Sequence, residues 1–355
     1  CIFSDSTPFA FQVVPGDSDK VLLFFQGGGA CWDEASTTAS LCTTDSSPQS
    51  LVGLFDRTNT KNKYRSYTIV HVSYCSGDLF GGNVTRSYND KKGQPVVQVG
   101  LFNAQSAVDW IKQQMKNGGL ASQLSEFVVS GCSAGSIGAQ LWGNEATKQI
   151  SWKHAAVIPD SYAGVFPDGS TGPLIYNFGF CSSGFLSAEL YQRCINQQLE
   201  LYDIEMEYIA ENPSVPFNFI QSKTDIVQQS FYTAVAASTG TKPTVLTPEQ
   251  FYTRVNTIFG LYNKGDSTRQ ANPNFVTYLV DGDQHCFTPS SVYYEADTKG
   301  PHDEGKSTST ELMYEWVNQY PLEEGSVTNT RCDAGSDSKT LCDEKVSPKS
   351  FTEDW

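Results

Sequence analysis

Residues 127–139 read FVVSGCSAGSIGA, which indicates a strand, a sharp turn and a helix in direct succession. The turn contains Gly-x-Ser-x-Gly, with Ser133 at its centre. A serine that attacks an ester must project from a tight strand-to-helix turn, and the flanking glycines keep other side chains away from it. Ser133 is therefore a candidate nucleophile. The alternative is a glycine-rich turn in which Ser133 only caps a helix over 137–147.

The helix that follows the turn offers a place for negative charge. Its first backbone N–H groups have no partner within the helix, and the positive end of the helix dipole adds to their effect. Acyl transfer develops a negative oxygen that such donors stabilise. Ala134 is therefore a candidate oxyanion donor.

A second glycine cluster follows an early apolar run. Residues 21–31 read VLLFFQGGGAC, a buried type of strand that ends in three glycines. In serine hydrolases of the α/β type, such a loop supplies further oxyanion donors, so Gly28 and Gly29 are candidates. A phosphate-binding loop is disfavoured because no Gly-Lys-Ser/Thr follows. A plain flexible turn is the remaining alternative.

The chain has four histidines from which a general base can be chosen. His71 and His154 lie within apolar runs, where a histidine is usually packed in the core. His302 lies in the polar segment KGPHDEG, which is typical of an exposed loop. His285 instead follows the strand-like run 275–280 by a short polar loop, which suits the last member of a triad in the order serine, acid, histidine. No second histidine lies at metal-ligand spacing from it, so we do not expect zinc. Acyl transfer by a serine, a histidine and an acid needs no cofactor, so we expect neither a metal nor an organic cofactor.

The acid is expected between Ser133 and His285, directly after a strand. Asp225 fits, because an apolar run over 215–220 gives way there to a polar turn and then a helix. Asp160 follows the run HAAVIP and is the alternative acid. Either aspartate could instead cap its own turn or helix.

Composition points to an oxidising compartment. The 355 residues include ten cysteines and three methionines, and Asn83-Val84-Thr85 is an acceptable N-glycosylation sequon at Asn83. Five disulfides could form, with pairing that the sequence does not give. The numbering starts at a cysteine with no basic or apolar leader ahead of it, as in a mature chain without its signal peptide. We expect a secreted, extracellular monomer without a membrane span.

The net charge of the chain disfavours some classes of binding partner. There are 24 basic and 39 acidic residues, which gives a formal net charge of −15. That charge argues against nucleic acid and against anionic membranes as partners. It would also repel a strongly polyanionic polymer at long range, although screening at ordinary salt limits the effect.

The order of apolar runs predicts an α/β fold. Short buried-type runs alternate with helical patterns, as in a mostly parallel central sheet flanked by helices. The clearest predicted helix covers 101–117, and others are expected over 186–211, 246–260 and 309–319. We expect a single catalytic domain over 1–325, with an inserted cap over about 160–214. The polar tail 326–355 is expected to be tied by its cysteines.

Six separated blocks resemble the pectin acetylesterase and Notum family of α/β-hydrolase-like carboxylesterases. They are GGGACW at 27–32, YCSGDLFGG at 74–82, SGCSAGS at 130–136, PDSYAG at 159–164, TDIVQQ at 224–229 and QHCF at 284–287. The resemblance implies Ser133 as nucleophile, Asp225 as acid, His285 as base and an oxyanion hole from Gly28, Gly29 and Ala134. Gln26, Ser136 and Thr224 depart from the residues usual in plant members.

The resulting hypothesis is a secreted serine carboxylesterase that acts on an ester substrate, most simply an O-acetyl group on a cell-wall polysaccharide. One alternative is a lipase or a polyester or aryl esterase with a larger acyl pocket. Another is a non-catalytic secreted protein that binds a glycan or a lipid on the same scaffold.

Overall fold

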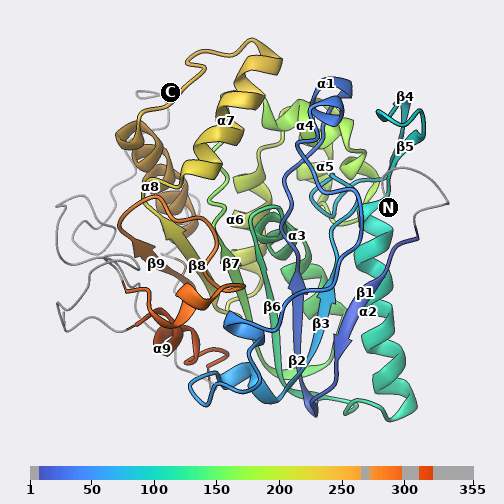
Figure 1. Ribbon diagram of the computed structural model, residues 1–355, viewed down its shortest axis with the longest axis vertical. Coiled ribbons are helices and arrows are strands. Elements are labelled where there is room, and N and C mark those ends of the chain that lie inside the picture. The colour runs from blue at the N-terminus through green and yellow to red at the C-terminus, as the bar shows by residue number, and fades with distance from the viewer. Residues whose placement is uncertain (1–7, 265–271, 273, 298–311, 323–355) are drawn as a thin grey trace.

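The centre of the protein is a seven-stranded sheet. In the computed structural model, which describes residues 8–264, 272, 274–297 and 312–322, the strand order is β1-β3-β2-β6-β7-β8-β9. All neighbouring strands are parallel except β1, which pairs antiparallel with β3 (Figure 1). The strands are β1 (Phe11–Val14), β2 (Asp17–Phe25), β3 (Tyr67–Val72), β6 (Leu124–Cys132), β7 (Trp152–Asp160), β8 (Phe217–Ser222) and β9 (Phe275–Val280). The predicted mostly parallel α/β fold is confirmed.

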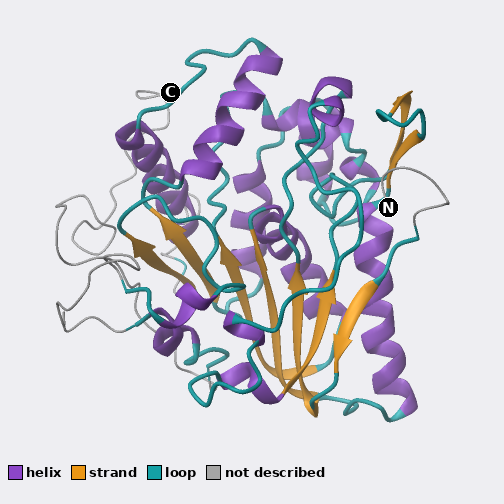
Figure 2. Cartoon of the chain, viewed as in Figure 1, coloured by secondary structure: helices purple, strands orange, loops and turns teal. Residues whose placement is uncertain are grey.

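Both faces of the sheet are buried, which explains why its strands read as continuous apolar runs. In β2, Val21, Leu23 and Phe25 face one core, and Leu22 and Phe24 face the other. The first core is covered by the long helices α2 (Gly100–Asn117), α3 (Ala134–Gln149), α6 (Leu201–Glu211) and α8 (Pro248–Lys264). The second is covered by shorter pieces: η1 (Gly53–Phe55), η2 (Lys63–Ser66), η4 (Ser291–Tyr294) and α9 (Met313–Val317) (Figure 2).

Helix α2 matches the helix predicted over 101–117 to within one residue. Its buried residues repeat at three- and four-residue steps and face the first core. The helix ends where Gly118 adopts a left-handed conformation with φ of 81°, which a residue without Cβ takes without strain. The apolar repeat and the terminal glycine therefore account for this helix and for its C-terminal end.

The predicted continuous helix over 186–211 is wrong. The structure has two helices there, α5 (Ala188–Ile195) and α6 (Leu201–Glu211). The chain leaves α5 at Gln197, which has a φ of 58°. Glu200 then caps α6 through a capping box with Asp203. The intervening backbone packs directly on Gly172, where a Cβ would overlap the carbonyl group of Gln197.

Four further helices and a hairpin complete the described chain. Helix α7 (Ile226–Thr239) follows β8, and α1 (Glu34–Thr38) and α4 (Thr171–Asn177) lie near the same end of the sheet (Figure 1). The short helix η3 (Phe180–Ser182) follows α4 in the chain. Strands β4 (Val84–Asn89) and β5 (Pro95–Gln98) form a separate hairpin. Helix α9 falls within the range predicted for the last helix. The predicted tail 326–355 lies outside the described residues. No helix in the described ranges combines the length and apolarity needed to cross a bilayer.

Candidate active site

The predicted site residues all follow parallel strands at one edge of the sheet. Gly28 and Gly29 follow β2, Ser133 follows β6, Asp225 follows β8 and His285 follows β9. Because these strands run in the same direction, their carboxyl ends meet, and the loops beyond them are neighbours (Figure 1). The topology thus brings together groups that are far apart in sequence.

Ser133 occupies a strained turn between β6 and α3. Its φ of 60° and ψ of −123° are unusual for a residue with a side chain. A Cβ on Gly131 would overlap the carbonyl oxygen of Gly135, and one on Gly135 would overlap that of Phe25. The two glycines are therefore required by close backbone approach, as the pentapeptide predicts.

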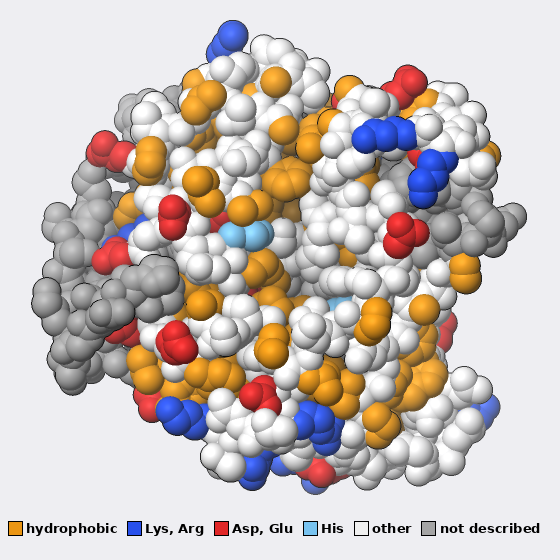
Figure 3. Space-filling model, in the orientation of Figure 1, with side chains coloured by type: hydrophobic (Ala, Val, Ile, Leu, Met, Phe, Trp, Pro, Cys, Tyr) orange, Lys and Arg blue, Asp and Glu red, His pale blue; other side chains and the backbone are white. Residues whose placement is uncertain are grey.

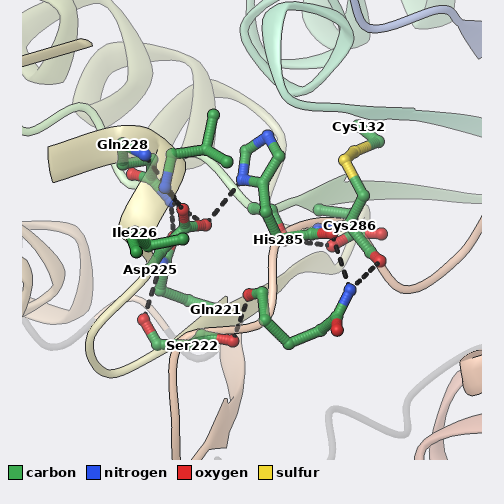
Figure 4. A network of polar contacts seen from close by, with 12 residues as sticks. Cys132, Gln221, Ser222, Asp225, Ile226, Gln228, His285 and Cys286 are labelled. Atoms are coloured by element: carbon green, nitrogen blue, oxygen red, sulfur yellow. Dashed lines mark hydrogen bonds and ion pairs between the residues drawn. A yellow bond between two sulfur atoms is a disulfide. The ribbon is translucent and has the colours of Figure 1, made fainter. Parts of the chain in front are cut away.

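His285 and Asp225 form a direct pair. The Nδ1 atom of His285 lies 2.7 Å from Oδ2 of Asp225, whose side chain is fully buried (Figure 4). Asp225 also caps α7: its Oδ1 accepts hydrogen bonds from the N–H groups of Val227 at 3.0 Å and Gln228 at 2.9 Å. The carboxylate is thus fixed in orientation by the helix that it begins.

The other ring nitrogen of His285 is available. Within the described chain, its Nε2 atom is buried and makes no hydrogen bond. A disulfide joins Cys132 to Cys286, with their Cα atoms 5.7 Å apart (Figure 4). These cysteines are the immediate neighbours of Ser133 and His285. The bond therefore fixes the serine turn beside the histidine loop.

Among the described residues, Cys132, His285 and Cys286 are the one set of three His, Cys, Asp or Glu side chains whose potential metal-ligand atoms lie close together. Ligand atoms of Cys132, His285 and Cys286 lie within 4.8 Å of one another. The two sulfur atoms are bonded to each other, so neither is a thiolate. Cys132 and Cys286 therefore form a cross-link and do not offer thiolate ligands to a metal.

Asp160, the alternative acid, has a different set of partners. Its Oδ2 accepts hydrogen bonds from the backbone of Phe287 and Thr288, and its Oδ1 accepts one from the hydroxyl of Ser161. Burial raises the pKa of the Asp160 carboxyl, and these hydrogen bonds oppose the rise. The structure thus places Asp225, rather than Asp160, against the ring of His285.

The loop that carries Gly28 and Gly29 packs against the serine turn. A Cβ on Gly27 would lie 3.1 Å from Cβ of Ser133, so the glycine loop packs directly on the nucleophile turn. Gly29 has a φ of 73°, and it lines a pocket together with Ser133 and Ala134. Gly28 is not among the lining residues. Among the described residues, the N–H groups of Gly28, Gly29 and Ala134 donate to no acceptor.

The pocket at Ser133 is apolar and has a volume of about 70 Å³. Its walls come from the glycine loop, from α3 and, above all, from the segment 162–204. That segment contributes Tyr162, Phe166, Leu174, Phe178, Phe180 and Ile204. Figure 3 shows this face of the molecule hollowed near its centre, with hydrophobic side chains in the hollow.

The other histidines lie elsewhere. His71 is buried in β3 between Phe24 and Phe55, and burial lowers its pKa to about 4. His154 lies near the start of β7, at the opposite end of that strand from Asp160. His302 is outside the described residues. Asn83, the predicted glycosylation acceptor, is exposed just before β4.

Several polar residues of the site were not predicted. Gln228 donates from Nε2 to Oδ2 of Asp225 at 2.9 Å, and Ser161 and Thr288 both bind the carboxylate of Asp160. The position of Gln228, three residues after the capping Asp225, is a signal that could have indicated its role. Ser161 and Thr288 gave no signal of their own, since their roles depend on contacts between distant segments.

This fold, with a strained serine turn and a histidine–aspartate pair at the carboxyl edge of a parallel sheet, is that of an α/β-hydrolase-like enzyme. The sequence matches the pectinacetylesterase family over residues 4–319. The chain therefore belongs to this family, as the six motif blocks predict, and it is a carboxylic ester hydrolase.

A solved structure supports the fold independently. The Wnt deacylase Notum from Drosophila superposes with a TM-score of 0.56 over 83% of this chain and 85% of that chain, at 16% sequence identity. At that identity the likeness concerns the fold. No curated protein is significantly similar to the chain in sequence.

The disulfides of the described residues fit an oxidising compartment. Three of them join Cys31 to Cys42, Cys132 to Cys286 and Cys181 to Cys194, and Cys75 is disulfide-bonded as well. The Cys132–Cys286 bond lies directly beside the nucleophile. Cys332 and Cys342 of the predicted tail lie outside the described residues.

Proposed function

We propose that the protein is an extracellular serine esterase that removes O-acetyl groups from a cell-wall polysaccharide. The observation that carries the proposal is the pairing of His285 with Asp225 at 2.7 Å, held by a disulfide beside the strained Ser133. Membership of the pectinacetylesterase family supports the same chemistry.

The mechanism has two acyl-transfer steps. The Ser133 hydroxyl attacks the ester carbonyl while Nε2 of His285 takes its proton, and Asp225 stabilises the imidazolium through Nδ1. The N–H groups of Gly28, Gly29 and Ala134 receive the oxyanion. His285 then gives the proton to the sugar oxygen as its bond to the acyl carbon breaks, which releases the sugar hydroxyl and leaves an acetyl group on Ser133. Water, deprotonated by His285, attacks this ester and releases acetate and the free serine.

The size of the pocket supports a short acyl group. A cavity of about 150 Å³ is known to hold one benzene molecule, and the volume here is about 70 Å³. A small pocket volume of this kind favours an acetyl group over a long acyl chain. We further propose that residues 160–214 act as a cap, since this segment supplies about half of the apolar wall.

The net charge of the protein affects which polysaccharide it can approach. With a formal net charge of −15, the molecule repels a polyanion at long range, which favours a neutral acetylated glycan over highly acidic pectin. The same charge supports the absence of nucleic-acid partners. We propose action as a monomer, because the histidine–aspartate pair and the serine turn come from one chain.

The test compares hydrolysis of p-nitrophenyl acetate, butyrate and palmitate by the wild type and by Ser133→Ala. We expect Ser133-dependent activity that is highest on acetate and falls beyond about four carbons. Acetate release from acetylated xylan and from acetylated pectin then identifies the polymer. Esterase activity that persists in purified Ser133→Ala would refute the assignment of the nucleophile.

A second candidate is an esterase for longer acyl chains. The observation in its favour is the apolar lining that continues from Ser133 to Leu141 and Ile204, farther than an acetyl group needs. Side-chain movement in the segment 162–204 would open this space. A preference for palmitate over acetate in the same assay would establish this alternative.

A further inference from the structure

Asp160 is bound to the loop that carries His285 by a dense set of hydrogen bonds. Its fully buried Oδ2 accepts from the N–H of Phe287 at 2.9 Å, and from the N–H and the hydroxyl of Thr288, both at 2.7 Å. Its Oδ1 accepts from the Ser161 hydroxyl at 2.7 Å, and that hydroxyl oxygen accepts from the N–H of Cys286 at 2.9 Å. Asp160 and Ser161 therefore hold all three residues that follow His285.

The main chain of the same two residues contacts the other parts of the site. The carbonyl oxygen of Asp160 accepts a hydrogen bond from the N–H of Ser133 at 3.0 Å. The N–H of Ser161 donates to the carbonyl of Ile220 at 2.8 Å, in the strand that leads to Asp225. The pair 160–161 is thus bonded to the nucleophile turn, the strand before the acid and the histidine loop.

Backbone strain is concentrated at this junction. Ser133, Ser161 and Cys286 have φ values of 60°, 61° and 64°, in the left-handed region that side chains disfavour. Such conformations persist only where the surrounding contacts determine them. The hydrogen bonds to Asp160 and Ser161, with the Cys132–Cys286 disulfide, are the contacts that reach all three residues.

We propose that Asp160 is a positioning residue that sets the placement of His285 relative to Ser133, through its carboxylate on residues 286–288 and its carbonyl on the nucleophile turn. This inference rests on the proposed catalytic roles of Ser133 and His285. Asp160 does not touch the imidazole; it holds the backbone on which the imidazole is mounted.

Two substitutions change the carboxylate of Asp160 while its backbone carbonyl can still accept from the N–H of Ser133. Asp160→Ala removes the carboxylate that accepts from four donors and leaves the hydrogen bond between the Asp160 carbonyl and the N–H of Ser133. Asp160→Asn keeps one oxygen that can still accept these donors, so it is the conservative variant. Because misplacement of a catalytic group by about 1 Å can cost about 100-fold in rate, we expect kcat to fall by about 100-fold in Asp160→Ala and less in Asp160→Asn. KM should be unchanged in both.

Two readouts distinguish positioning from a general structural role. The first is the acidic midpoint of the kcat/KM profile: a displaced His285 loses part of its bond to Asp225, its protonated form is less stabilised, and the midpoint moves to lower pH. The second is the downfield proton resonance of the His285 Nδ1–H, identified by its loss in Asp225→Asn. We expect it to shift or broaden in both Asp160 variants.

Tyr64→Phe is the matched control for stability. The Tyr64 hydroxyl is fully buried and bonds the carbonyls of Val317 and Tyr320, in the second core. Its loss should lower the melting temperature and leave kcat, the pH midpoint and the histidine resonance as in the wild type. If Asp160→Ala does not fold, the double variant Ser161→Ala/Thr288→Val removes hydroxyl contacts of the same junction and is expected to lower kcat in the same way.

The possible results distinguish failure of the proposed esterase function from failure of the positioning role of Asp160. Activity in Ser133→Ala would refute the proposed function itself. If Ser133→Ala is inactive but a folded Asp160→Ala keeps the wild-type kcat, midpoint and resonance, only the positioning role is refuted. A fall in kcat with unchanged midpoint and resonance, together with a lower melting temperature, would also refute it, since that pattern indicates a structural role alone.

Discussion

Asp225 combines two tasks in one side chain. One carboxylate oxygen caps α7, and the other accepts a hydrogen bond from Nε2 of Gln228 at 2.9 Å and faces Nδ1 of His285. Capping interactions fix the carboxylate before any substrate binds, so little reorganisation is needed when the imidazole becomes charged. An aspartate that begins a helix is therefore well suited to orient a catalytic histidine.

The change Asp225→Asn tests this arrangement. An asparagine caps a helix about as well as an aspartate, so we expect the melting temperature to change little. Its amide cannot stabilise the imidazolium and favours the wrong tautomer of His285, so kcat on p-nitrophenyl acetate should fall by about 10⁴-fold. A variant that keeps more than about a tenth of the wild-type kcat would refute the role of Asp225.

Gly29 provides a second residue-scale prediction. A side chain at this position would overlap the carbonyl oxygen of Leu41 and would have to adopt a φ of 73°. Gly29→Ala should displace the candidate oxyanion donor and lower kcat by about 100-fold, the order of the loss when one such donor is removed. Gly93 is the matched control, because it has a φ of 75° but open space where Cβ would be.

Measurement of kcat and melting temperature for Gly29→Ala and Gly93→Ala separates strain from catalysis. Both variants carry the left-handed penalty of about 1 to 2 kcal/mol, and only Gly29→Ala is next to Ser133. Equal loss of kcat in the two variants would contradict a role for the glycine loop in the site.

Among the helices and strands, the ones that could be predicted from the sequence are those set by a local pattern of residues. The buried strands are continuous apolar runs, and α2 has both an apolar repeat and a terminal glycine, so both could be recognised. The break between α5 and α6 could not, because Gln197 adopts its left-handed conformation without a glycine or proline in the surrounding sequence. The contacts of Asp160 with Ser161 and Thr288 likewise require knowledge of which strands are neighbours.

Helix α6 contains a buried acid that makes stability depend on pH. Both carboxylate oxygens of Glu205 are buried without a hydrogen-bond partner in the described chain, and burial raises the pKa of this group well above 4.5. The folded state therefore binds more protons than the unfolded state as pH rises above about 4.5. Stability from this group is greatest below that pH and falls by about 1.4 kcal/mol per pH unit until the folded pKa is reached.

The substitution Glu205→Gln tests this, because a glutamine side chain cannot ionise. Relative to the wild type, this variant should gain free energy of unfolding at pH 7 and lose that advantage near pH 4.5. Urea denaturation at the two pH values measures the difference. The same difference in stability at both pH values would mean that Glu205 does not carry the titration.

At the scale of the whole molecule, the parallel sheet assembles a site from segments spread over most of the chain. The contributions come from residues 27–29, 133–134, 160–161, 225 and 285–288, and each segment lies at the end of a strand. Non-local pairing of this kind is entropically costly to form. Residues 285–288 are joined to the earlier segments by the Cys132–Cys286 disulfide and by the hydrogen bonds of Asp160. These connections therefore affect both the stability of the fold and the geometry of the site.

The Cys132–Cys286 disulfide joins two of these distant segments covalently. It closes a loop with a sequence separation of 154, whereas Cys181–Cys194 closes one of 13. By the loop-entropy relation, Cys132→Ser/Cys286→Ser should lower the free energy of unfolding by about 5 kcal/mol, and Cys181→Ser/Cys194→Ser by about 3 kcal/mol. Denaturant unfolding of both double variants measures this. The first should also lower kcat at a temperature where it remains folded, because Ser133 and His285 lose their covalent connection. Equal destabilisation with wild-type kcat in the first variant would show that hydrogen bonds alone hold the two segments in register.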